Sequence, residues 1–89
     1  SPIKVLEYMA SETAVIVPDY LCNREIITHD IDGLLFEPKN EIDLADKIES
    51  LILQPERLKP LGKMAKKTVL RKFSWESTWG RALDEIIGG

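Results

Sequence analysis

The chain has 89 residues, of which 44% are hydrophobic and 30% are charged, and its formal net charge at pH 7 is −3. This length fits one small domain, so residues 1–89 are predicted to form a single domain. The composition excludes a disulfide within the chain and a cysteine zinc cluster, because Cys22 is the only cysteine. It also excludes a membrane-spanning helix, which needs about 20 consecutive apolar residues. The acidic balance gives no general attraction to nucleic acid, and we expect a cytoplasmic protein.

A helix over residues 2–10 is the first predicted element, and it is the most informative one. Pro2 suits the first helical position. The free amides of Ile3 and Lys4 would lie at the positive end of the helix dipole and offer an anion site. Glu7 places a carboxylate close to the same end. Because such a helix normally follows a strand, we expect the back part of a binding domain, with its front part absent.

Two short strands are predicted next. Residues 14–17 form a continuous apolar run, which is typical of a strand buried on both faces of a parallel sheet. Asn23 is predicted to cap a short helix over residues 24–29. A second strand is predicted at residues 34–36, after the turn at Asp32 and Gly33. This strand–helix–strand order predicts an α/β fold, a partial Rossmann-like three-layer domain with short parallel strands flanked by helices.

The second half of the chain is predicted to be helical. Asn40, with Asp43 three residues later, marks a helix start. Pro60 and Gly62 should bend or delay the following helix, and Ser74 should cap a last one. The three apolar stripes comprise Leu44, Ala45, Ile48, Leu51 and Ile52, then Leu58, Leu61, Ala65, Thr68 and Val69, and finally Trp75, Trp79, Ala82, Leu83, Ile86 and Ile87.

Four segments in order resemble the donor-nucleotide domain of GT-B glycosyltransferases, specifically the retaining family 4 (glycosyl transferases group 1). They are P-I-K-V-L-E-Y-M-A from Pro2, N-R-E-I-I with D-G-L-L-F-E-P from Asn23, N-E-I-D-L from Asn40, and K-F-S-W from Lys72. The chain departs from the family at Glu12, Thr13 and Ala14, where the family commonly has Gly-x-Pro. Losing that glycine implies a strained or altered turn.

The resemblance implies the function and the site. It implies the C-terminal portion of a nucleotide-sugar-binding domain, in an enzyme that transfers a sugar from a nucleotide-sugar donor to an acceptor without a metal cofactor. Glu7 matches the second of two family glutamates and would hydrogen-bond the ribose hydroxyls. The amides of Ile3 and Lys4 would approach the donor diphosphate, and the Lys4 ammonium could neutralise its charge. The first glutamate would precede Ser1, so we expect the isolated chain to be inactive.

Other interpretations compete with this one. The chain could be a small dimeric interaction module derived from a glycosyltransferase domain, and a homo-oligomer would cover apolar faces left bare. Residues 57–72 hold seven of the twelve basic residues and no acid. We interpret them as the solvated face of a core helix, in preference to a membrane surface. His29 is interpreted as a helix-end residue and not as a catalytic one.

Overall fold

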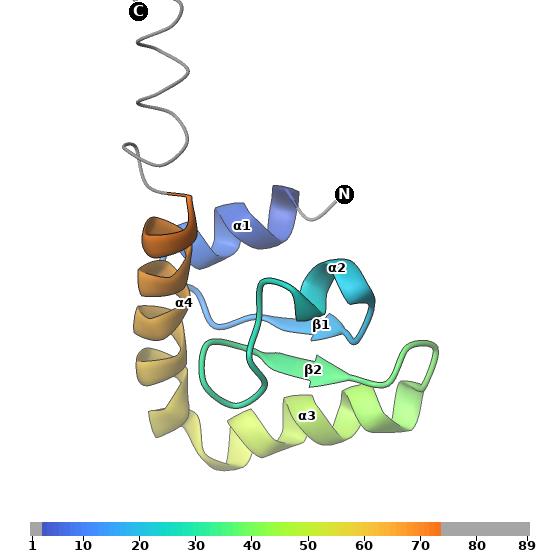
Figure 1. Cartoon of the computed structure of the whole chain (residues 1–89). Coiled ribbons are helices and arrows are strands. Elements are labelled where there is room, and N and C mark those ends of the chain that lie inside the picture. The colour runs from blue at the N-terminus through green and yellow to red at the C-terminus, as the bar shows by residue number, and fades with distance from the viewer. Residues whose placement is uncertain (1–2, 74–89) are drawn as a thin grey trace, which may run out of the picture.

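The computed structural model describes residues 3–73 and contains a small parallel sheet with helices around it (Figure 1). The elements in chain order are α1 (Ile3–Ala10), β1 (Ile16–Pro18), α2 (Leu21–Arg24), β2 (Leu34–Phe36), α3 (Glu41–Leu53), the 3-10 turn η1 (Pro55–Arg57) and α4 (Leu58–Lys72). Strands β1 and β2 pair in parallel, with Ile16 opposite Leu34. The predicted α/β class is therefore confirmed. The predicted role of Pro2 and the helix predicted after Ser74 lie outside the described residues.

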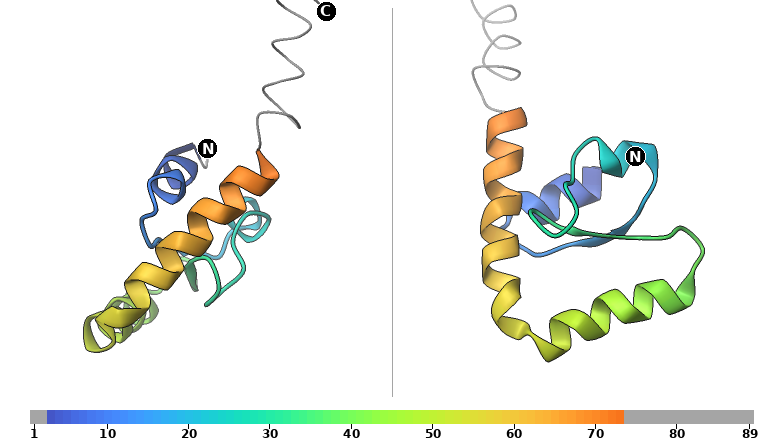
Figure 2. Two further views of the ribbon diagram at one scale, coloured as in Figure 1. Left: turned by 90° about the vertical axis from the view of Figure 1, so that its left-hand side faces the viewer. Right: turned by 60° about the horizontal axis from the view of Figure 1, so that its bottom comes forward.

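Helical side chains cover both faces of the sheet, as the continuous apolar run predicts. Val15 and Val17 belong to a core cluster on one face. The intervening residue Ile16 packs against a second cluster on the other face. The first cluster also contains Met9, Ile26, Ile27 and Ala65, and the second contains Leu34, Leu51 and Leu61. Helix α4 supplies a residue to each cluster, so it ties the two layers together (Figure 2).

The expected bend in the second long helix is absent, because α4 is continuous from Leu58 to Lys72. Pro60 lies in the first turn, where its missing N–H and fixed φ are tolerated. Gly62 has a different role. A Cβ on this residue would lie 2.1 Å from the carbonyl oxygen of Glu12. Helix α4 can approach the turn after α1 this closely only because Gly62 has no side chain.

The turn after α1 is strained, as the departure from the family pattern implied. Glu12 has a φ of 62°, a left-handed conformation that costs most residues free energy and glycine very little. Its carboxylate lies 3.7 Å from the ammonium of Lys66, so the side chain also makes an ion pair with α4.

Asn23 does not cap a helix over residues 24–29, and that prediction is wrong. The helix is shorter and earlier, Leu21–Arg24, and its N-cap is Tyr20. Asn23 lies inside it, is buried, and donates from Nδ2 to the carbonyl oxygen of Pro18 at 2.9 Å. This bond holds α2 against the end of β1, while Ile26 and Ile27 are buried as expected.

His29 is also not at a helix end, which corrects its interpretation. It lies in the segment before β2, and its Nδ1 accepts a hydrogen bond of 2.9 Å from the backbone N–H of Leu35. That N–H is in the middle of β2 (Figure 1). Successive residues of a strand alternate between its two edges, and Leu34 donates to Val15, the residue just before β1. The imidazole of His29 therefore covers the outer edge of β2.

The start of α3 follows the prediction, but its apolar stripe does not. Asn40 Oδ1 accepts from the N–H of Asp43 at 2.9 Å, which confirms the cap. Of the predicted stripe, Leu51 is buried and Leu44 half-buried, whereas Ile48 and Ile52 are 44% and 70% exposed. The two-stranded sheet is too narrow to cover the whole stripe within residues 3–73.

Candidate functional site

The carboxyl edge of the sheet gathers the ends of several elements. Strands β1 and β2 end at Pro18 and Phe36, side by side. Helices α1 and α3 begin on the same side of the molecule, at Ile3 and Glu41 (Figures 1 and 2). Ligands of open α/β sheets bind beyond the carboxyl ends of the strands. The N-terminal turn of α1, in which the sequence predicted a site, is therefore on the appropriate edge.

Burial of one side of α1 fixes which side chains point outward. Met9 is fully buried in the core, and Val5 and Leu6 pack against the same cluster. The opposite side of the helix presents Lys4 and Glu7, whose side chains are 80% and 59% exposed. The structure thus brings these two predicted site residues together on the accessible side of α1.

Ile3 is the third predicted site residue, and it lies in the first turn with a side chain that is 60% exposed. Ile3 therefore does not belong to the buried side of α1. Its proposed role uses the backbone amide. The first amides of a helix have no acceptor within the helix, so the position suits that role.

Lys4 and Glu7 form an ion pair, with 3.6 Å between Nζ and Oε2. The pair joins residues three apart on an exposed helix, and such pairs contribute little to stability because solvent screens them. A ligand can therefore separate them at small cost. Glu7 could then accept hydrogen bonds from hydroxyl groups while the ammonium of Lys4 faces an anion.

Two hollows flank this edge of the molecule. One, of about 330 Å³, is lined by Lys4, Val5 and Tyr8 of α1 and by residues 13–17. The other, of about 300 Å³, lies between the segments that follow β1 and β2, and Tyr20 and Lys39 are among its lining residues. Tyr20 and Lys39 were not predicted as site residues, although each lies just after a predicted strand, where ligands of parallel sheets bind.

One carboxylate near this edge has a shifted pKa. The N–H of Glu37 donates to Asp43 Oδ2 at 2.6 Å, and Lys47 Nζ lies 2.9 Å from Oδ1. These contacts, first the backbone hydrogen bond and then the lysine, hold the pKa of Asp43 below its ordinary value of 3.8. Asp43 is thus a charged structural anchor of the segment between β2 and α3.

His29 lies beside a charged residue. Within residues 3–73, no three His, Cys, Asp or Glu side chains are grouped as a metal site requires. His29 Nε2 lies 3.5 Å from Asp30, which also accepts from Arg57 at 2.8 Å.

Within residues 3–73, no helix is long and apolar enough to cross a membrane.

Comparisons with known proteins agree with this fold. Residues 1–68 match the family described as glycosyl transferases group 1. The chain is 38% identical over 69 residues to "Putative glycosyltransferase EpsD" of Bacillus subtilis (strain 168), a match covering 78% of the chain and 18% of that protein. A search of solved structures found sucrose-phosphate synthase from Thermosynechococcus elongatus, with a TM-score of 0.81 and 25% identity.

That structural match covers 94% of this chain and 22% of the synthase chain. The chain thus spans about a fifth of the length of either protein. The family match covers more than half of the chain, and the fold is that of a GT-B glycosyltransferase. The resemblance inferred from the four sequence segments is confirmed: the chain belongs to the glycosyl transferases group 1 family.

Proposed function

We propose that this chain forms part of the donor-binding half of an enzyme that transfers a sugar from a nucleotide-sugar donor to an acceptor. The single observation that carries the proposal is the exposed pair of Lys4 and Glu7 in the N-terminal half of α1, the helix that begins at the carboxyl edge of the sheet. Membership in the glycosyl transferases group 1 family supports glycosyl transfer as the reaction class.

In this proposal each predicted site residue has one role. The carboxylate of Glu7 accepts hydrogen bonds from the ribose hydroxyls of the donor. The backbone amides of Ile3 and Lys4 lie near its diphosphate, where the helix dipole favours negative charge. The ammonium of Lys4 leaves Glu7 and neutralises part of the diphosphate charge. No metal ion is needed for these contacts, and we expect none.

Calorimetric titration of the full-length enzyme with a panel of nucleoside diphosphates tests the proposal. Glu7→Ala should weaken binding roughly ten- to a hundred-fold, because a hydrogen bond to a charged group contributes about 1.5–3 kcal/mol. Lys4→Ala should have a smaller effect that depends on salt. The fold should be unchanged, since both side chains are exposed.

Glu49→Ala is the matched control, because Glu49 is an exposed glutamate on α3. It should leave the affinity unchanged. Equal affinity of the wild type and Glu7→Ala for every nucleotide of the panel would overturn the role of Glu7. We further expect the 89-residue chain alone to bind these nucleotides weakly and to transfer no sugar.

The alternative of a small interaction module makes the opposite prediction. Such a module would bind a protein partner through its exposed apolar residues, and donor nucleotides would have no measurable affinity even for the full-length protein. Ile48 and Ile52 on α3 are exposed apolar residues, which favours a surface for binding a protein on this helix. The same titration therefore separates the two functions.

A further inference from the structure

Charge is strongly segregated along this sequence. Residues 57–72 carry a charge of +7, whereas the rest of the chain carries −10. Most of these residues form α4, which is one straight helix in the structure. A basic segment that contains no acid is unusual on a chain whose overall balance is acidic, and the core does not require it.

Three of the seven cations have structural partners. Arg57 donates to Asp30 at 2.8 Å, and Lys66 lies 3.7 Å from the carboxylate of Glu12. Lys72 donates to the carbonyl oxygen of Glu25 at 2.8 Å. The remaining four are exposed and make no ion pair within residues 3–73: Lys59, Lys63, Lys67 and Arg71.

These four cations lie on the side of α4 that faces away from the core. The buried side consists of Leu61, Gly62, Ala65 and Thr68. Helical spacing of 3.6 residues per turn places Lys59, Lys63 and Lys67 on the opposite side. Helical spacing also places Leu70, which is 57% exposed, on this side.

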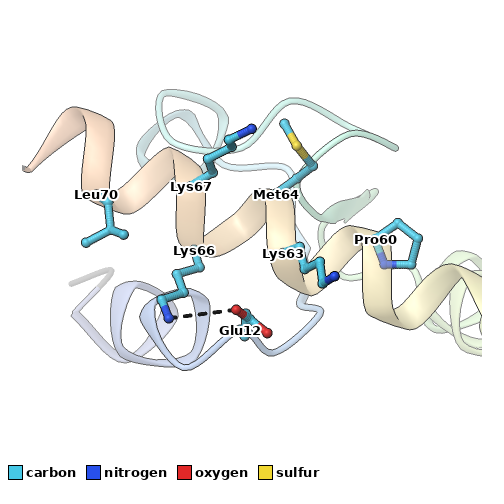
Figure 3. Close-up of a pocket in the computed structure, with 7 residues that line it drawn as sticks. All are labelled: Glu12, Pro60, Lys63, Met64, Lys66, Lys67 and Leu70. Atoms are coloured by element: carbon cyan, nitrogen blue, oxygen red, sulfur yellow. Dashed lines mark ion pairs between the residues drawn. The ribbon is translucent and has the colours of Figure 1, made fainter.

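Figure 3 shows how the two kinds of side chain alternate along this surface. Lys63, Lys66, Lys67 and Leu70 project from the helix around a shallow hollow of about 470 Å³, with Glu12 at its rim. Lysine stems can lie along an apolar surface while their ammonium groups extend beyond it. The arrangement is that of a helix suited to the boundary between lipid headgroups and acyl chains.

We propose that the outer face of α4 binds an anionic phospholipid surface. Charge complementarity identifies the occupant: the exposed cations attract anionic headgroups, and the exposed Leu70 enters the outermost acyl layer. A plane contacts only this one face, and charges that lie more than about 8 Å from the plane are largely screened by salt. A nucleic acid would find no aromatic side chain for base stacking in α4.

Vesicle co-sedimentation with the purified protein tests this proposal. We expect binding to vesicles of phosphatidylcholine mixed with phosphatidylglycerol, weakening as salt is added, and none to phosphatidylcholine alone. Each lysine near an anionic surface contributes about fivefold to partitioning, so Lys63→Glu with Lys67→Glu should lower it at least about 25-fold. Leu70→Gln should weaken binding without changing its salt dependence.

Lys39→Glu is the matched control for Lys63→Glu, because both replace an exposed lysine and change the net charge equally. Only Lys63→Glu should lower vesicle binding, while circular dichroism shows both variants folded. Equal losses for the two variants would overturn the proposal, because net charge alone would then explain binding. Failure of the wild type to bind anionic vesicles would overturn it too, as would preferential binding to single-stranded DNA. None of these results depends on the donor site.

Discussion

Thr68 donates a hydrogen bond of 2.6 Å from its hydroxyl to Oδ2 of Asp32, and both residues are buried. The other carboxylate oxygen of Asp32 accepts from the N–H of Thr28 at 2.7 Å. The pair joins α4 to the segment that leads into β2, across 36 positions of sequence. A buried carboxylate needs such donors, because an unsatisfied one carries a large desolvation cost.

Replacing Thr68 by valine should therefore lower the free energy of unfolding by about 1–3 kcal/mol. Valine keeps the shape of threonine and removes the hydroxyl, so it leaves Asp32 with one partner fewer. Urea unfolding measures the change. Thr68→Ser keeps the hydroxyl and should cost less. A valine variant as stable as the wild type would show that the hydrogen bond to Asp32 does not stabilise the fold.

Gly62→Ala should also destabilise the protein. In an open helix this change stabilises by about 1 kcal/mol, but here the new Cβ would overlap the carbonyl oxygen of Glu12 at 2.1 Å. We expect a loss of about 1–3 kcal/mol as α4 moves away from the turn. Lys63→Ala, at the next and exposed position, should change stability by less than about 0.5 kcal/mol. A stabilised Gly62→Ala variant would show that the close contact is absent.

Glu12→Gly should be more stable than Glu12→Ala. Both variants lose the ion pair with Lys66, but only glycine adopts a φ of 62° without strain. The expected difference in the free energy of unfolding is about 1 kcal/mol. Thermal unfolding of the two variants side by side gives it directly. Alanine equal to glycine would indicate an unstrained turn.

The lowered pKa of Asp43 makes stability depend on pH in a defined direction. A carboxyl whose folded pKa lies below its unfolded value stabilises the fold above the unfolded value, here 3.8, and this contribution disappears as the pH falls through the folded pKa. Asp43→Asn should therefore be less stable than the wild type at neutral pH, with the gap closing in acid below 3.8. Urea unfolding over this range measures it, and Asp46→Asn, at an exposed position of α3, is the matched control, which should leave stability at neutral pH unchanged.

Exposed apolar residues on α3 lead us to predict self-association. Ile52, which is 70% exposed, would be covered in a dimer. Ile52→Lys should shift the sedimentation coefficient toward that of a monomer without lowering stability. Ile31→Lys adds the same charge at an apolar residue that is 52% exposed elsewhere, and should leave association unchanged. A wild-type chain that sediments as a monomer at all concentrations would contradict the prediction.

Local patterns in the sequence predicted the parts of this structure that depend on near neighbours. The apolar run at residues 14–17 identified a strand covered on both faces, and Asn40 identified a helix start by its bond to Asp43 three residues away. The first turn of α1 was assigned to the candidate site from the same kind of local pattern. These features depend on contacts within a few residues, or on periodicity.

The errors come from contacts between separate elements of the fold. Asn23 looked like a cap, but its amide donates to Pro18 in β1. His29 was interpreted as a helix-end residue, but its Nδ1 accepts a hydrogen bond from the N–H of Leu35 in β2. Lys72 looked like solvated charge, although it donates to Glu25, 47 residues away. No local pattern contains that information.

The imidazole of His29 covers the outer edge of β2, so a further strand would pair more readily with β1. An added strand would have to displace His29 from the N–H of Leu35. In β1, Ile16 directs its backbone groups to the opposite side, because its neighbour Val15 accepts from Leu34 of β2. Two copies that joined through their β1 edges would each keep a blocked edge at β2. Such pairing ends at two molecules, so the histidine acts as a gatekeeper against fibrous aggregation.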